Sequence, residues 1–415
     1  MFGTIWRWAR QQARRIHVRV ILVAVLNLVA LGLAAVAGPW LPPGLAGRVG
    51  AGAVDAILQV LASSMLAVTT FSLTVMVTGF SRAEGQWSPR GQELLRQDTV
   101  THSVLATFLG AFLYALIGII LRAAGVFGED DLVVLFAVTV AVALWIVVTM
   151  IRWIVHLDGF GSLSFTLDAI EARAAEAVAG FARSPAQGAQ VLPPGAHPPA
   201  GGTGVHATRA GHVEQVYEGA LQEAAAFLDA EIYVLRPVGS FVQPGDLLAR
   251  VVGGRSPGDE SEAAIRAAIP VGAARSFEMD PVHAIATLAE VGTRALSPGV
   301  NDPQTAVAVV YRLARVLGAV AAAAPEPAPR CDRVWLAAVP LERLVDAGFG
   351  AVARHAGGAL EVNLALQDAL GSLTRLGHAG LAEAARAAAE DHARRALAAT
   401  GDPVDRARIE AARAR

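Results

Sequence analysis

The sequence contains no lysine, so every cationic side chain other than histidine is an arginine. Lysine Schiff bases, P-loop nucleotide sites and the lysine that carries a lipoyl or biotinyl group are therefore excluded. Cysteine is almost absent as well. The single Cys331 excludes an intramolecular disulfide and a multi-cysteine metal or iron–sulfur site. The formal net charge of −2 gives no overall basic field, so we do not expect nucleic acid as a partner.

Motifs for catalysis are also lacking. The ten histidines are scattered, and none stands in an H-E-x-x-H arrangement. No G-x-S-x-G elbow, Walker loop or dinucleotide-binding glycine pattern occurs in a fitting context. We therefore predict that the protein is not an enzyme and has no cofactor and no metal site.

Apolar residues are present in excess: 54% of the chain is hydrophobic and only 17% is charged. The excess lies in the first third, where four stretches reach the length of about 20 residues that crosses a bilayer. The prediction is an α-helical membrane protein. A basic segment (1–18) comes first, then a transmembrane domain (19–156) and a C-terminal domain (157–415). The four spans are predicted at residues 19–40, 54–80, 102–123 and 132–155.

The arginines predict the orientation of these spans. Five arginines precede the first span, three lie between the second and third, and Arg152 ends the fourth. The other two loops hold only Arg48 and Arg122. Because cytoplasmic loops collect arginine, both termini are expected in the cytoplasm. The missing lysine, with abundant alanine and glycine, is typical of a GC-rich bacterial genome. We therefore predict a multi-pass protein of the bacterial cytoplasmic (inner) membrane, with the lipid bilayer as its partner.

The second predicted span carries a stripe of small polar residues. At about 100° per residue, these side chains share one narrow sector of the helix. Such a stripe either lets helices pack closely or lines a hydrated path through a homo-oligomer, and both interpretations stay open. No ionisable residue lies deep in any span, which disfavours proton relays and charge-coupled pumping. The stripe consists of Ser63, Thr70, Thr74, Thr78 and Ser81.

The remainder of the chain reads as a mixed α+β cytoplasmic domain. A helix is predicted over 163–182, a Pro/Gly-rich loop over 184–204, a small β unit over 206–252 and a helical region over 280–415 that contains one strand, at 333–339. The glycine spacing of the β unit is similar to that of barrel-sandwich modules, which usually carry a modified lysine. Since no lysine is present, only the fold of those modules is expected here.

Two Asp-Pro pairs, Asp280-Pro281 and Asp302-Pro303, read as helix starts, because aspartate caps the free N–H groups and proline fits the first turn. The second pair belongs to a corner with two open interpretations. Either the free N–H groups of a helix N-terminus hold an anion or a partner's carboxylate, or the corner is purely structural. The residues of this corner are Ser297, Pro298, Gly299, Asn301, Asp302, Pro303 and Thr305.

Several segments together resemble a known family. They are FSLTVMVTGF at the end of the second span, GQWSPRGQELLRQD after it, VLRPVGSFVQPGDLLARV, SPGVNDPQTA and LERLVDAGFGAVARHA. Together with the four N-terminal spans, they resemble the bacterial membrane-protein family catalogued as domain of unknown function 2254. The resemblance implies the fold and a membrane location, and it brings no established activity. Besides the corner, it highlights Phe71, Ser72, Ser88, Pro89, Arg90 and Ala306.

Two functions from different classes fit these features. The first is a homo-oligomeric channel or passive transport protein, with the stripe lining the path and the cytoplasmic domain regulating it. The second is a membrane-anchored scaffold or sensor whose cytoplasmic domain binds a protein or a small ligand. Ser88, Pro89 and Arg90 are predicted at the cytoplasmic mouth of the spans, where Arg90 is expected to meet lipid phosphate or an acidic residue such as Asp302.

Overall fold

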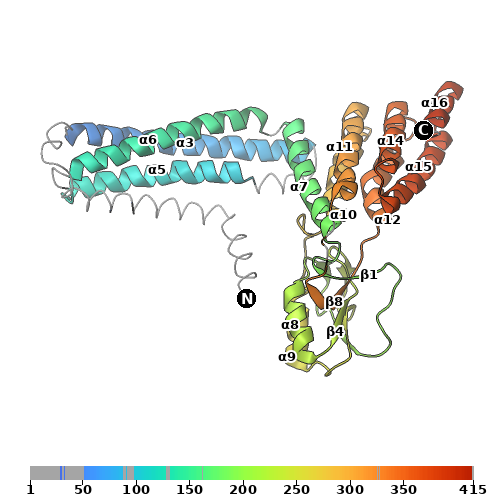
Figure 1. Ribbon diagram of the computed structural model, residues 1–415. Helices are drawn as coiled ribbons and strands as arrows, with labels where there is room; N and C mark the ends of the chain where they lie inside the picture. The colour runs from blue at the N-terminus through green and yellow to red at the C-terminus, as the bar shows by residue number, and fades with distance from the viewer. Residues whose placement is uncertain are drawn as a thin grey trace. The chain divides into compact units, whose positions relative to one another are not determined.

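The structure is a computed structural model that describes residues 29, 32, 51–86, 90, 98–127, 131–160, 162–324, 326 and 328–413. The chain divides into two compact units, Met1–Thr166 and Leu167–Arg415, called here the N-terminal unit and the C-terminal unit (Figure 1). Except for Val29 and Gly32, the predicted span at 19–40 lies outside the described residues, as does the basic segment 1–18.

The described part of the N-terminal unit consists mainly of three long helices, α3 (Ala51–Gln86), α5 (Thr99–Ala123) and α6 (Asp131–Gly159). They lie side by side along their length in Figure 1. Each is long and apolar enough to cross a membrane, and the qualifying segments are Gly52–Gly79, Val100–Ala123 and Asp131–Gly159. These segments agree with three of the four predicted spans.

Polar contacts between the helices supplement the apolar packing of this unit. The Trp153 indole N–H donates to Ser72 Oγ at 2.9 Å, and both side chains are buried. Tyr114 Oη and Thr139 Oγ1 lie 2.9 Å apart in a second buried contact. Because lipid gives apolar helices little reason to associate, such bonds help to hold the bundle together. Ser72, one of the residues highlighted by the family resemblance, is thus a contact between α3 and α6.

An ion pair joins α3 to α5 near one end of this unit. The Arg122 guanidinium contacts the Asp55 carboxylate in a fork, through Nε at 3.0 Å and Nη2 at 2.9 Å. Bidentate pairs of this kind are the strong ones. Arg122, counted with a loop in the sequence analysis, thus lies in the last turn of α5 and is committed to a helix contact.

A fourth helix, α11 (Pro303–Ala322), also has the length and composition of a span, although it belongs to the C-terminal unit. Its apolar residues are buried against other helices of that unit, and Arg312 stands in its middle. Arg312 Nη1 contacts Asp168 Oδ1 at 2.6 Å and also pairs with Glu171. We interpret α11 as a core helix of the C-terminal unit, because its two arginines, Arg312 and Arg315, both pair with Glu171 of the same unit.

The C-terminal unit contains two sheets. The larger has the strand order β1-β8-β4-β6-β2. Its first three strands, β1 (Ala189–Leu192), β8 (Cys331–Ala337) and β4 (Glu231–Val234), run parallel to one another. β6 (Leu247–Val252) pairs antiparallel with β4 on one side and with β2 (Thr203–His206) on the other. The smaller sheet has the order β5-β3-β7, from β5 (Phe241–Val242), β3 (Gly211–Val213) and β7 (Val271–Gly272).

This arrangement differs from the predicted β unit. The barrel-sandwich expectation for 206–252 is not supported, because the main sheet is mixed and takes strands from outside that range. β1 lies in the segment predicted as a loop (184–204). β8 agrees with the strand expected over 333–339 inside the otherwise helical region 280–415. Parallel strands need a long crossover, so their pairing leaves no local signal in the sequence.

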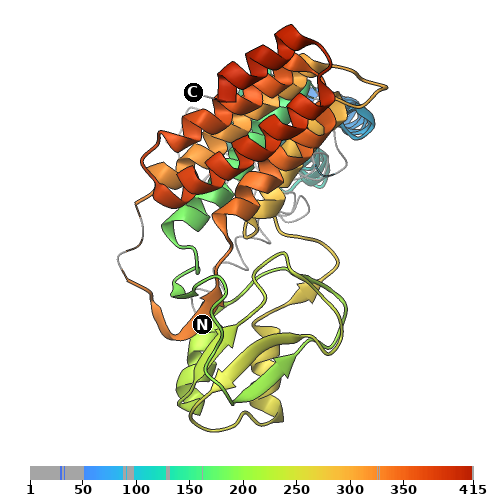
Figure 2. The same ribbon diagram turned by 90° about the vertical axis from the view of Figure 1, so that its right-hand side faces the viewer.

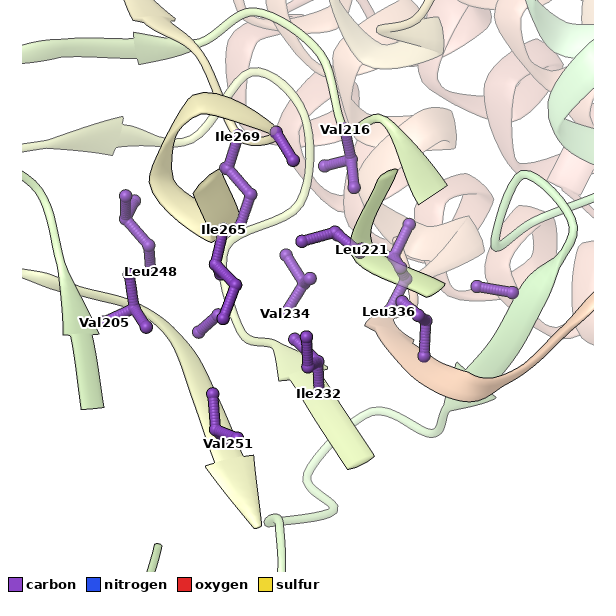
Figure 3. Packing of buried hydrophobic residues seen from close by; sticks show 14 of the residues in the cluster. Val205, Val216, Leu221, Ile232, Val234, Leu248, Val251, Ile265, Ile269 and Leu336 are labelled. Atoms are coloured by element: carbon purple, nitrogen blue, oxygen red, sulfur yellow. The ribbon is translucent and has the colours of Figure 1, made fainter. Parts of the chain in front are cut away.

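One face of the main sheet is covered by α8 (Glu218–Leu228) and α9 (Asp259–Ala267). Leu221 of α8 and Ile265 of α9 point towards Ile232 and Val234 of β4 in Figure 3. All four side chains are fully buried. Burial of an aliphatic side chain of this size contributes about 1.5–3 kcal/mol relative to exposure, so this face forms the core of the β region.

The remaining elements of the C-terminal unit form a helical bundle beside the sheets (Figure 2). As predicted, Asp280 and Asp302 cap helices and each precedes a proline at the first position. Asp280 accepts a hydrogen bond from the His283 N–H, and Asp302 accepts one from the Thr305 N–H, each at 3.0 Å. The helices are α7 (Leu163–Arg183), α10 (Pro281–Ala295), α11, α12 (Leu341–Val345), the π-helical turn η3 (Asp346–Gly350), α13 (Ala351–Ala356), α14 (Leu360–Thr374), α15 (Ala379–Ala399) and α16 (Pro403–Arg413).

Candidate ligand-binding cavity

The face of the main sheet opposite the core carries a row of large and polar side chains. Trp335 pairs with Tyr233, and Tyr233 pairs with Arg250, so the three side chains stand in register across β8, β4 and β6. The rings of Tyr233 and Trp335 stack with centroids 5.7 Å apart and planes 8° apart. Because side chains alternate along a strand, this row points away from the buried Ile232 and Val234.

An irregularity in β6 sets which residues reach this outer face. Val205 of β2 pairs with Ala249, whereas the next residue, His206, pairs with Leu247, so Leu248 is an extra residue in β6. A bulge of this kind places neighbouring residues on the same face. Leu248 and Ala249 both lie in the core, and Leu247 and Arg250, three residues apart, both line the outer face.

A cavity of about 630 Å³ lies over this outer face. Three of its lining side chains are basic: His197, Arg236 and Arg250. The other lining residues carry no polar side chain; they are Leu192, Pro193, Pro194, Gly195, Ala196, Pro198, Leu235, Leu247, Ala337, Ala338 and Pro340. The volume falls within the range of about 300–1,000 Å³ that is typical of small-molecule sites.

The cavity is cationic, because no acidic side chain lines it. Among the residues that the structure describes, no carboxylate pairs with Arg236 or Arg250. The nearby Glu231 is committed elsewhere, since it accepts a hydrogen bond from the Tyr233 hydroxyl at 2.6 Å. Burial, reinforced by Glu231, raises the pKa of Tyr233 to about 12, so this hydroxyl keeps its proton and its bond to Glu231 at neutral pH. Two guanidinium groups therefore face the cavity without a protein counter-ion from the described chain.

One hydrogen-bond donor of this row is not used. The Trp335 indole N–H is buried, and no acceptor for it lies within the described part of the chain. A buried donor without a partner costs about 1–3 kcal/mol. The outer face of the sheet thus contains one buried donor that stays unsatisfied within the described part of the chain.

The stripe of α3 is exposed with respect to the described helices. Its hydroxyls donate to carbonyls of the same helix: Thr70 to Leu66 at 2.9 Å, Thr74 to Thr70 at 3.0 Å and Thr78 to Thr74 at 2.9 Å. Ser63 and Ser81 bond in the same way to Gln59 and Val77. Satisfied hydroxyls suit lipid, a packed helix or a hydrated path alike, so both interpretations of the stripe stay predictions.

The corner before α11 is held by local bonds. The Asp302 carboxylate accepts from the N–H and the hydroxyl of Thr305, at 3.0 and 2.5 Å, and these bonds lower the pKa of Asp302. Asn301 takes a positive φ of 48°, and its N–H donates to Ser297 at 2.9 Å. Pro298 and Gly299 are exposed, and Pro303 is partly exposed. The cap takes an N–H that an anion would need, which favours the structural interpretation.

Of the juxtamembrane residues, Ser88 and Pro89 lie outside the described part of the chain, and Arg90 is exposed. The contact expected between Arg90 and Asp302 stays a prediction. The stripe belongs to the N-terminal unit and the corner to the C-terminal unit.

No motif in the sequence predicts the cavity. Its lining comes from the presumed loop and from three strand ends that are distant in sequence. The available signal was weak: Arg236 in VLRPV and Arg250 in LLARVV are arginines set among apolar strand residues.

Comparison with known proteins supports the membrane assignment. A family model described as "Predicted membrane protein (DUF2254)" matches residues 14–372. Uncharacterised proteins of Mycobacterium bovis and Mycobacterium tuberculosis are 26% identical over 285 residues, which cover 67% of this chain and 54% of theirs. The chain thus spans about half the length of these relatives. No solved structure matches.

Proposed function

Since the chain belongs to the DUF2254 family of predicted membrane proteins, we propose that it is a membrane-anchored sensor whose C-terminal unit binds a small anionic ligand. In this proposal the protein lies in the bacterial inner membrane with both termini in the cytoplasm. The distribution of arginines around the spans supports this orientation. The ligand then reaches the cavity from the cytoplasm.

The observation that carries the proposal is the charge of the cavity. Arg236, Arg250 and His197 line it, and every other lining residue lacks a polar side chain. Two arginines that share an open cavity repel each other, so an anion that enters gains two charge-assisted contacts. A binding site explains this arrangement better than a purely structural role, which would place a carboxylate between the guanidinium groups.

Ligand binding has a direct route into the helical bundle. Ala337, Ala338 and Pro340 line the cavity, and α12 begins at the next residue, Leu341. This helix continues through η3, where Gly348 packs against Ile285 of α10. π-Helical turns within α-helices are frequent at functional sites. A ligand that shifts the end of β8 would thus move the helix that packs against α10.

We expect Arg236→Gln combined with Arg250→Gln to abolish anion binding. Loss of a charge-assisted hydrogen bond costs about 1.5–3 kcal/mol, or roughly tenfold in affinity for each arginine. The measurement is the shift in melting temperature and the calorimetric affinity of the purified full chain with phenyl phosphate, phenyl sulfonate and benzoate. Arg209→Gln is the matched control, because Arg209 is exposed in the same unit and does not line the cavity. Equal anion affinities of the double variant and the wild type would rule out the proposed site.

The channel is the second candidate, and the exposed hydroxyl stripe of α3 favours it. In that proposal copies of the chain assemble around an axis lined by Ser63, Thr70, Thr74 and Thr78. We expect Thr74→Trp to reduce planar-bilayer conductance at least tenfold, because an indole fills a narrow path. Thr149→Trp on α6 is the control: Thr149 is partly exposed, and its hydroxyl bonds to its own helix at 2.8 Å. Absence of current from the wild type, or equal loss in both variants, would reject the channel.

A further inference from the structure

We infer that the ligand of the cavity is an amphiphilic phosphate, a phosphate monoester attached to an apolar body. This inference rests on the proposed function, since it names the chemical class that the same cavity binds. It follows from the two kinds of surface that line the cavity: a basic cluster (His197, Arg236 and Arg250) and an apolar remainder.

The basic cluster fits a dianion better than a monoanion. Two guanidinium groups and an imidazole face one cavity, and no described carboxylate neutralises either arginine. A carboxylate ligand would balance one of the two guanidinium charges, whereas a phosphate monoester carries close to two negative charges at neutral pH. The planar fork of arginine also matches two phosphate oxygens at once.

The apolar remainder argues against a sugar or polyol body. Apart from the basic cluster, no lining residue offers a hydroxyl, amide or carboxylate side chain. Four lining positions are prolines (193, 194, 198 and 340), which have no backbone N–H to donate. Nearby backbone groups are already paired: the Ala338 N–H donates to Leu192 and the Leu235 N–H to Leu248, at 3.0 and 2.9 Å.

The cost of a polar body is therefore large. Each hydroxyl that loses water without gaining a partner costs about 1–3 kcal/mol. Leucine, alanine and proline side chains gain instead from covering an apolar ring or chain. A ligand that satisfies both surfaces has a phosphate at one end and a hydrocarbon or aromatic group at the other.

The test compares matched probes by isothermal titration with the purified full chain. Phenyl phosphate and octyl phosphate combine a phosphate with an apolar group. Glucose 6-phosphate has the phosphate on a polar sugar, and benzoate and octanoate have the apolar group with a carboxylate in place of the phosphate. We expect the two apolar phosphates to bind about tenfold or more tightly than glucose 6-phosphate and than the carboxylates. Competition by phosphatidic acid in nanodiscs would identify a lipid as the source, and its absence would identify a soluble ester.

Two variants sharpen this test. Arg250→Gln should weaken all phosphates about tenfold, whereas Ala338→Gln, which adds an amide to the apolar wall, should shrink the preference for phenyl phosphate over glucose 6-phosphate. If glucose 6-phosphate or benzoate binds as tightly as phenyl phosphate, the class is wrong and the anion site itself stands. If no probe binds, the proposed function falls together with this inference.

Discussion

Gly239→Ala should lower the free energy of unfolding of the C-terminal unit by about 4 kcal/mol or more. Gly239 has a φ of 84°, and a Cβ at this position would collide with Asp280 Oδ2. Asp280 cannot move freely: its side chain is 1% exposed, contacts Arg275 Nη2 at 2.6 Å and caps α10 through the His283 N–H. The added methyl group therefore strains the backbone and also displaces a buried, paired carboxylate.

The size of the effect follows from these two parts. A non-glycine residue in the left-handed region costs about 1–2 kcal/mol. Breaking a buried ion pair by displacing one partner costs about 3–5 kcal/mol, because a charge stays buried without compensation. The loss should be concentrated where the β region meets the bundle, since Gly239 precedes β5 and Asp280 precedes α10.

Gly245→Ala carries the backbone cost alone, so the difference between the two variants gives the cost of displacing Asp280. Gly245 has a similar φ of 91° in the same region, and no atom lies within 4 Å of its added Cβ. We expect this control to cost only about 1–2 kcal/mol. Urea unfolding of the full chain and hydrogen exchange of the α10 and β3 amides measure the difference. Equal losses in the two variants would show that the Asp280 contact does not bear on stability.

Local features of the C-terminal unit were predictable from the sequence. The Asp-Pro pairs at 280 and 302 cap helices as expected, because capping depends on a few adjacent residues. The helix predicted at 163–182 is found at Leu163–Arg183. Three spans were likewise found within a few residues, since their signal is a long apolar run.

Long-range features were not predictable in this way. β1 pairs with β8 in parallel, with Ala189 opposite Cys331, and nothing near Ala189 announces a partner so distant in the chain. The cavity depends on that pairing and on the bulge at Leu248, which brings Leu247 and Arg250 to one face. Length and composition alone also do not tell whether α11 is a membrane span or a core helix. Its apolar face packs against other helices, and its Arg312 pairs with Glu171.

His392→Leu should remove a pH dependence of stability worth about 3 kcal/mol. His392 lies on α15 with a side chain that is 5% exposed, and its Nδ1 has no hydrogen-bond partner among the described residues. Burial lowers the pKa of His392 to about 4, and the attraction of Asp391 and Asp346 only partly opposes this, while Arg395 and Arg354 add to it. An exposed histidine titrates near 6.5.

The sign follows from which state binds the proton first. As the pH falls below about 6.5, the unfolded chain protonates this imidazole while the folded chain keeps it neutral, so unfolding is favoured. The loss grows until the folded state also protonates, near pH 4. Wild-type stability should therefore fall between pH 7 and pH 4 by about 3 kcal/mol more than that of His392→Leu.

The comparison needs a control, because carboxylates also titrate in this range. His355→Gln removes an exposed imidazole from α13, where Nδ1 lies 2.9 Å from the Ala351 carbonyl. We expect this variant to follow the wild type at every pH, whereas His392→Leu should diverge from it below about pH 6.5. Urea unfolding of the full chains at pH 7, 6, 5 and 4 provides the four points. Parallel curves for the wild type and His392→Leu would mean that the buried imidazole gains its proton without unfolding, and that α15 admits water or an anion beside it.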